Sequence, residues 1–138
     1  MPVQTKTRTD VEQAIRELAN EYAARYNRRD AQGVSTLFTS DGVSNPPFQE
    51  AAKGPATIRK AQDQQFQELD PKNLRIETDH VEAAGELGFC FGRYTMNVKT
   101  PDGKRLDDRG KWVCALRQES GNWRVVANCW NSDLKLTA

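Results

Sequence analysis

One stretch of the sequence places hydrogen-bonding and aromatic side chains together in an apolar setting, as small-molecule sites do. Residues 121–133, GNWRVVANCWNSD, follow a turn signal and are rich in Trp and Val, so they predict a β-strand. Because side chains alternate along a strand, Asn128 and Trp130 share one face. A buried amide is costly unless it is hydrogen-bonded. We therefore expect Asn128 either to hold a structural hydrogen bond or to contact a ligand beside the Trp130 ring.

The titratable side chains form no recognised catalytic or metal-binding pattern. His80 is the only histidine and has no metal-ligand spacing around it, so neither a Ser-His-Asp triad nor a zinc site is expected. Asp41 follows a predicted helix, where a turn hydrogen bond is its usual role. Asp107, Asp108 and Arg109 form a charged cluster for which ion pairing at the edge of a hairpin is the favoured interpretation. Asp108 also shares its parity with a row of apolar residues and could reach the rim of a pocket.

Helices are predicted in the first half of the chain. Residues 9–26 carry apolar side chains at helical spacing, behind a capping box that starts at Thr9. Tyr22 lies on that apolar face, where its hydroxyl can serve either the core or a pocket. A short second helix begins after Asp30 and is expected to continue through Phe38. A third helix starts at the Gly-Pro pair of residues 54–55.

The second half of the chain changes to strand periodicity. Four strands are predicted at residues 74–83, 86–99, 105–118 and 122–133. The connecting turns are short, so these strands should form an antiparallel meander. An earlier segment, residues 43–48, contains two prolines and is at best an edge strand.

Helices followed by an antiparallel sheet define an α+β domain. We expect three helices packed on a strongly curved antiparallel sheet over residues 9–134, preceded by a disordered tail at 1–8. Where such a cone is too wide for side chains to fill, a pocket remains. The convex face, with Trp123, Val125 and Cys129, would expose an apolar patch, so we expect a homodimer through the sheet.

The composition excludes several classes of function. There are 20 basic and 19 acidic residues and no long basic run, so no nucleic-acid partner is expected. No apolar run approaches the ~20 residues of a membrane span, and the N-terminus lacks a signal-peptide core. We expect a cytoplasmic protein with no membrane partner. The three cysteines match no zinc or disulfide pattern, so we expect buried, reduced thiols at Cys90, Cys114 and Cys129.

Local motifs along the chain are similar to those of a known superfamily. They are YNRRD at 26–30, LFTSD at 37–41, GPATIR at 54–59, GRYT at 92–95, DDRGKW at 107–112 and WNSD at 130–133. In order and spacing the sequence resembles the nuclear transport factor 2-like superfamily, in particular its ketosteroid isomerase-like and SnoaL-like branch. The resemblance implies a cystatin-like cone fold. It does not imply one reaction, because this fold hosts isomerases, dehydratases, epoxide hydrolases, cyclases and non-enzymatic binding modules.

The resemblance also implies roles for individual residues. Tyr22 falls where steroid isomerases of this fold carry an oxyanion donor, and Asn128 stands where many relatives carry an acid. The general base of those isomerases would fall near residues 45–46 and their second acid near 111–112, where this chain has no carboxyl group. Classical steroid isomerisation is therefore not expected. The implied set is Tyr22 and Asn128 as catalytic residues, with Gln62, Phe91, Arg93 and Trp130 as substrate-binding residues.

Two functions remain open from the sequence. The first is a cofactor-free isomerase, cyclase, dehydratase or hydrolase in which Tyr22 and Asn128 stabilise an oxyanion on a small, mostly apolar substrate. Arg93, if its strand register turns it inward, would favour a carboxylate-bearing substrate. The second is a non-catalytic module that binds a small ligand or another protein. Neither function calls for a metal or a cofactor, and none is expected.

Overall fold

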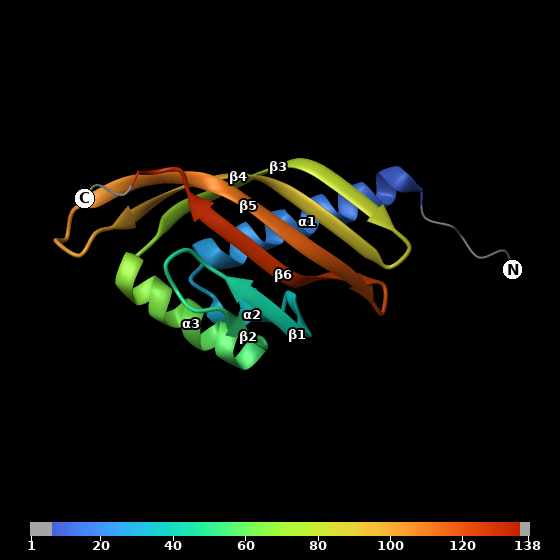
Figure 1. Cartoon of the computed structure of the whole chain (residues 1–138), viewed down its shortest axis with the longest axis horizontal. Helices are drawn as coiled ribbons and strands as arrows, with labels where there is room; N and C mark the ends of the chain where they lie inside the picture. Colours follow the sequence, from blue (N-terminus) through green and yellow to red (C-terminus); the bar gives the residue numbers. More distant parts are fainter. Residues whose placement is uncertain (1–6, 136–138) are drawn as a thin grey trace, which may run out of the picture.

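The computed structural model describes residues 7–135, which form three helices and a six-stranded mixed sheet. The elements are α1 (Arg8–Asn27), α2 (Ala31–Ser35), β1 (Phe38–Asn45), β2 (Ala52–Lys53), α3 (Pro55–Leu69), β3 (Lys72–Ala84), β4 (Leu87–Lys99), β5 (Arg105–Glu119) and β6 (Asn122–Ser132). The long strands β3 to β6 arch over α1, and α3 lies beside β1 and β2 (Figure 1). The predicted α+β class is confirmed.

The N-cap of helix α1 lies two residues before the predicted one. The backbone N–H of Asp10 donates to the Thr7 hydroxyl at 3.1 Å, and the Thr7 N–H donates to the Asp10 carboxylate at 3.3 Å. This reciprocal pair satisfies free N–H groups of the first turn and replaces the capping box predicted from Thr9. Arg8 is already helical although the predicted tail included it, and the rest of that prediction, at residues 1–6, lies outside the described residues.

The second helix is shorter than its apolar pattern predicts. Helix α2 ends at Ser35, and Phe38 begins β1 instead of continuing the helix. The reason is tertiary: β1 runs parallel to β6, with Phe38 opposite Val125, and the Val125 N–H donates to the carbonyl oxygen of Leu37 at 2.8 Å. Backbone pairing with a strand far along the chain outweighs the local preference.

The sheet has the order β2-β1-β6-β5-β4-β3. Its last four strands form the predicted antiparallel meander, with ends within two residues of those expected. The parallel pairing of β1 with β6 makes the sheet mixed rather than wholly antiparallel. The chain therefore brings its first strand against its last one, directly beside the segment that carries Asn128.

Strand β6 contains a β-bulge that reassigns its two faces. Ala115 of β5 lies opposite Ala127, whereas its neighbour Leu116 lies opposite Val125. Val126 is thus one extra residue without a counterpart on β5, which reverses the alternation on either side of it.

The bulge corrects one prediction about the sheet surface. Trp123 and Val125 lie on the concave face and are only 7% and 4% exposed, although strict alternation placed them on the convex face. Asn128 and Trp130, beyond the bulge, also face the concave side. All four of these side chains, two on each side of the bulge, therefore lie on the same concave face of β6. Cys129 lies on the convex face as expected, but its side chain is exposed, whereas a buried thiol was expected.

The position of the α1 cap can be tested by its contribution to stability. The variant Thr7→Ala removes the hydroxyl that accepts the Asp10 N–H, and such losses cost about 1 kcal/mol. We expect urea unfolding to show a free energy of unfolding lower by that amount. Thr9→Ala is the matched control, since Thr9 lies within the helix and Ala is the better helix former there. The reverse order of the two variants would contradict the observed cap.

Candidate functional site

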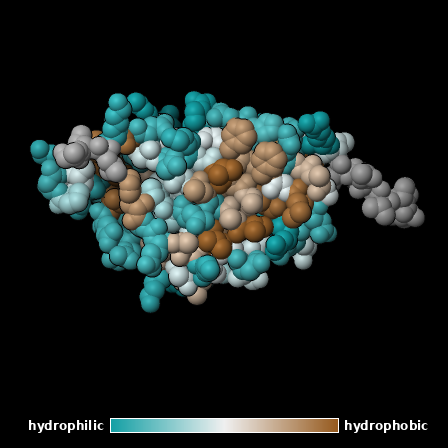
Figure 2. Space-filling model, in the orientation of Figure 1, coloured by the Kyte–Doolittle hydropathy of each residue, from teal (hydrophilic) through white to brown (hydrophobic). Residues whose placement is uncertain are grey.

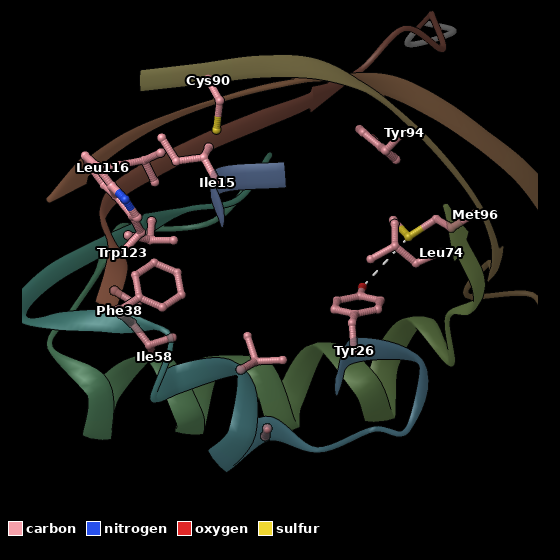
Figure 3. Close-up of a cluster of buried hydrophobic side chains, with 14 of the residues drawn as sticks. Ile15, Tyr26, Phe38, Ile58, Leu74, Cys90, Tyr94, Met96, Leu116 and Trp123 are labelled. Carbon is pink, nitrogen blue, oxygen red and sulfur yellow. Dashed lines mark hydrogen bonds between the residues drawn. The ribbon is translucent and has the colours of Figure 1, made fainter. Parts of the chain in front are cut away.

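A cavity lies between α1 and the concave face of the sheet. It measures about 70 Å³, counted as the space open to the centre of a water molecule. One water needs roughly 10–15 Å³ on this measure, so several waters or a compact organic molecule fit. Figure 3 shows the buried side chains in two groups on either side of this space. Ile15, Cys90 and Leu116 lie on one side, and Tyr26 and Tyr94 lie on the other.

Tyr22 of α1 and Asn128 of β6 both line this cavity, as expected for the implied catalytic pair. Asn128 is buried, at 6% exposure, and its side-chain Oδ1 accepts the backbone N–H of Asn45 at 3.1 Å. The Asn45 side chain donates in turn to the Asn128 carbonyl oxygen at 2.9 Å. Because a backbone N–H can only donate, the amide atom facing it must be the oxygen. The NH₂ group of Asn128 is therefore the part that remains for other partners.

The Tyr22 hydroxyl is held in its protonated form. Burial raises the pKa of Tyr22 above its usual range, as does the neighbouring Cys114, while the Asn128 side chain acts in the opposite direction. A phenol with a raised pKa is a hydrogen-bond donor at neutral pH. The cavity wall thus carries an O–H donor and an NH₂ donor close together, which is the arrangement that binds a carbonyl oxygen or an oxyanion.

The Tyr26 hydroxyl is engaged by α3. It donates to Gln65 Oε1 at 2.9 Å, and Gln62 Nε2 donates to the same oxygen at 2.8 Å. Gln62, implied by the resemblance as a substrate-binding residue, lines a second and smaller cavity next to α3 rather than the main one. Trp130 lines both cavities, so its ring lies between them. The structure brings Trp130 together with Tyr22 and Asn128, and leaves Gln62 on its other side.

The expected placement of Phe91 and Arg93 in the pocket was wrong. Both lie on the convex face: Phe91 is 43% exposed, and Arg93 bonds the Asp79 carboxylate through two nitrogens at 3.0 Å each. The reason is register, since Cys90, Gly92 and Tyr94 are the residues of β4 that turn inward. A shift of one residue exchanges the two faces of a strand.

Three hydrogen-bonded residues at the margin of the cavity were not predicted to lie together from the sequence. Tyr94 lines the cavity and donates its hydroxyl to Asp108 at 3.0 Å, and the Ser132 hydroxyl donates to the same carboxylate at 2.6 Å. The Tyr94 ring packs edge-on against Trp130, with 5.3 Å between ring centroids. Gly110 allows this, because a Cβ there would lie 2.6 Å from the Tyr94 ring. The ion pairing favoured for Asp108 was wrong, since this carboxylate is buried and bonded to hydroxyls; strand parity pointed to its place but not to its partners.

The other titratable residues considered from the sequence, Asp41 and His80, do not line the main cavity. Asp41 is exposed, and hydrogen bonding from Thr39 and the charge of Arg117 lower its pKa. His80 pairs with Glu82 at 2.9 Å in an exposed contact. Within residues 7–135, no residue that lines the main cavity carries a carboxyl group.

The described residues contain neither a candidate metal-binding cluster nor a helix that could span a membrane. Residues 7–135 hold no cluster of three or more His, Cys, Asp or Glu side chains able to bind a metal ion. Across the same span, no helix combines the length and the apolar character needed to cross a bilayer.

Comparison with known proteins shows where this fold occurs. A family model described as a SnoaL-like domain matches residues 19–127. A ketosteroid isomerase-like protein from Erwinia carotovora atroseptica is 20% identical, with a TM-score of 0.81 over 89% of this chain and 96% of that chain. A nuclear transport factor 2-like protein with a cystatin-like fold, from Novosphingobium aromaticivorans, is 17% identical, with a TM-score of 0.69 over 92% and 90% of the two chains.

A third solved structure, a protein with a cystatin-like fold from Nostoc punctiforme, is 18% identical with a TM-score of 0.73 over 96% of this chain and 98% of that one. At these identities the structural likeness shows the fold alone. The resemblance expected from the sequence is confirmed. Because the matched family model spans most of its length, the chain belongs to the SnoaL-like family.

Proposed function

We propose that this chain binds a small, mostly apolar molecule in the main cavity and that Tyr22 and Asn128 hold a carbonyl oxygen of that molecule. The observation that carries the proposal is the hydrogen bond from the Asn45 N–H to Asn128 Oδ1, which reserves the Asn128 NH₂ group for the cavity. The apolar lining and the Trp130 ring would hold the body of the ligand.

The same donor pair would support catalysis without a cofactor. In an isomerisation, cyclisation or dehydration, negative charge develops on the carbonyl oxygen, and two fixed donors stabilise it. In a site shielded from water each such donor contributes about 2.7–4 kcal/mol to the transition state. Among the described residues, no carboxyl group that could act as a general base lines the cavity. Oxyanion stabilisation would therefore contribute more to the rate than general-base catalysis.

A cytoplasmic location suits the thiols of the cavity. Cys90 and Cys114 are directly opposite each other on β4 and β5 and are both free. A hydrogen bond to Cys90, followed by burial, raises the pKa of the Cys114 thiol. We propose that a reducing compartment keeps this pair from forming a disulfide beneath the ligand.

A second proposal concerns the convex face, which we assign to a second copy of the chain. Figure 2 shows an apolar area in the middle of the face that is turned to the viewer. The exposed apolar residues of β4 and β5 include Phe89, Phe91 and Val113, with exposed fractions of 40%, 43% and 47%. Cys129 of β6 adjoins Val113. An apolar sheet face of this kind suits a homodimer, or another protein in an assembly role.

The ligand proposal predicts a preference for ketones over matched hydrocarbons. 1-Indanone and indane differ by one carbonyl group, so the comparison isolates the contribution of the donor pair. We expect 1-indanone to bind about five- to thirtyfold more tightly, as one or two hydrogen bonds of about 1 kcal/mol each would give. Binding constants from isothermal titration calorimetry measure the ratio. The double variant Tyr22→Phe, Asn128→Leu should reduce it to about one.

The matched control for this experiment is Tyr26→Phe. It removes the same atom one helical turn further on, from a hydroxyl that Gln65 already engages, so the ketone preference should persist. A double variant that kept the full preference would show that the carbonyl group binds elsewhere.

The homodimer proposal predicts a solution mass of twice 15.6 kDa by light scattering at micromolar concentration. Val113→Asp introduces a charge between the cross-strand neighbours Phe91 and Cys129 and should yield a monomer. Gln67→Asp, on the exposed face of α3, is the control and should leave the dimer intact. A wild-type mass of one subunit would contradict the proposal.

A further inference from the structure

The lining of the main cavity is unusually aromatic for its size. Five aromatic side chains, from three different strands and from α1, border it: Tyr22, Tyr26, Tyr94, Trp112 and Trp130. Within the described residues the lining contains no Lys, Arg or His. The faces of aromatic rings are negative and attract cations within about 6 Å of the ring centre. Such a surround therefore favours an organic cation over an anion.

A buried carboxylate lies next to these rings without a cationic partner. Asp108 is 9% exposed, and among the described residues its two oxygens accept only the neutral hydroxyls of Tyr94 and Ser132. Within residues 7–135, no Lys, Arg or His nitrogen forms an ion pair with it, whereas Asp107, one residue away, points outward and is exposed. A buried charge is costly unless it is compensated, and hydroxyl donors compensate it only in part.

The charge of Asp108 affects the pKa values of two tyrosines that line the cavity. Burial is the largest cause of the raised pKa of Tyr94, and the Asp108 charge is the next. The Tyr26 pKa is also raised, first by burial and then by groups that include Asp108. Arg29 opposes this effect at Tyr26, but its guanidinium is itself bonded to Asp70. Asp108 therefore places a negative charge next to the Tyr94 side of the cavity.

We propose that the ligand of this cavity is a small organic cation, an ammonium-bearing molecule whose charged group lies among Tyr94, Trp130 and Trp112 beside Asp108. The inference rests on the proposed function, because it concerns the same cavity and names the chemical class of its ligand. The ammonium group would balance the Asp108 charge, and an oxygen elsewhere in the molecule would reach Tyr22 and Asn128. Arg93, which would have favoured a carboxylate, lies on the opposite face of the sheet.

The test compares two molecules of the same shape that differ in charge. Choline carries a trimethylammonium group, and 3,3-dimethyl-1-butanol has carbon in place of the nitrogen. We expect choline to bind the wild-type protein at least about tenfold more tightly, since a cation desolvated among aromatic rings gains that much or more. Dissociation constants from NMR titrations give the ratio. Equal or weaker binding of choline would overturn the proposal.

Two charge-removing variants assign the preference to Asp108. Asp108→Asn removes the charge and keeps one of the two acceptor oxygens, while its NH₂ group can donate to the other hydroxyl, so the choline preference should fall several-fold. Asp107→Asn removes the same charge from the neighbouring residue on the outer face, where Asn97 is its partner, and should leave the preference unchanged. Equal effects of the two variants would overturn the role of Asp108. The wild-type comparison stands even if Asp108→Asn does not fold.

The failure of this inference can be told apart from that of the proposed function. If 1-indanone binds with its carbonyl preference while choline shows none over its carbon analogue, the cation proposal is wrong and the donor pair stands. If choline is preferred while 1-indanone is no better than indane, the cavity binds cations and the donor pair is wrong. If none of the four molecules binds, both proposals are wrong.

Discussion

The hydrogen bond between the Asn45 N–H and the Asn128 side-chain oxygen joins the first strand of the sheet to the last one inside the core. It fixes which way the Asn128 amide points, and with that the chemistry that the cavity offers. A buried amide oxygen left without this donor would cost about 1–3 kcal/mol, so the orientation is not free to reverse. The amide is therefore both a structural contact of β1 with β6 and part of the cavity lining that it shares with Tyr22.

The bulge at Val126 gives β6 two functions on one face. On one side of it, Trp123 and Val125 pack into the core, and on the other side Asn128 and Trp130 border the cavity. Without the extra residue, one of these pairs would turn to the convex surface. Helix α1, whose N-cap is Thr7, supplies the opposite wall of the cavity. The shape of the cavity therefore depends on both the β6 bulge and this helix.

The sequence was informative where local patterns decide the structure, and silent where distant pairing does. Strand positions, the start of α3 and the family followed from periodicity, turn residues and motifs. The inward orientation of Asn128 was predicted correctly, although the bulge that separates it from Trp123 was not visible. Phe91 and Arg93 were assigned by resemblance, and an error of one residue in register placed them on the wrong face. The pairing of Tyr94 with Asp108 joins neighbouring strands and needed the register of β4 on β5.

The most direct test of this account is a crystal structure of the protein soaked with 1-indanone. The account predicts that the ring system lies among the apolar side chains of the main cavity, with its oxygen within hydrogen-bond distance of Tyr22 Oη and Asn128 Nδ2. An oxygen that faced the apolar end at Ile15 and Leu116, or a ligand bound only on the convex face, would contradict it.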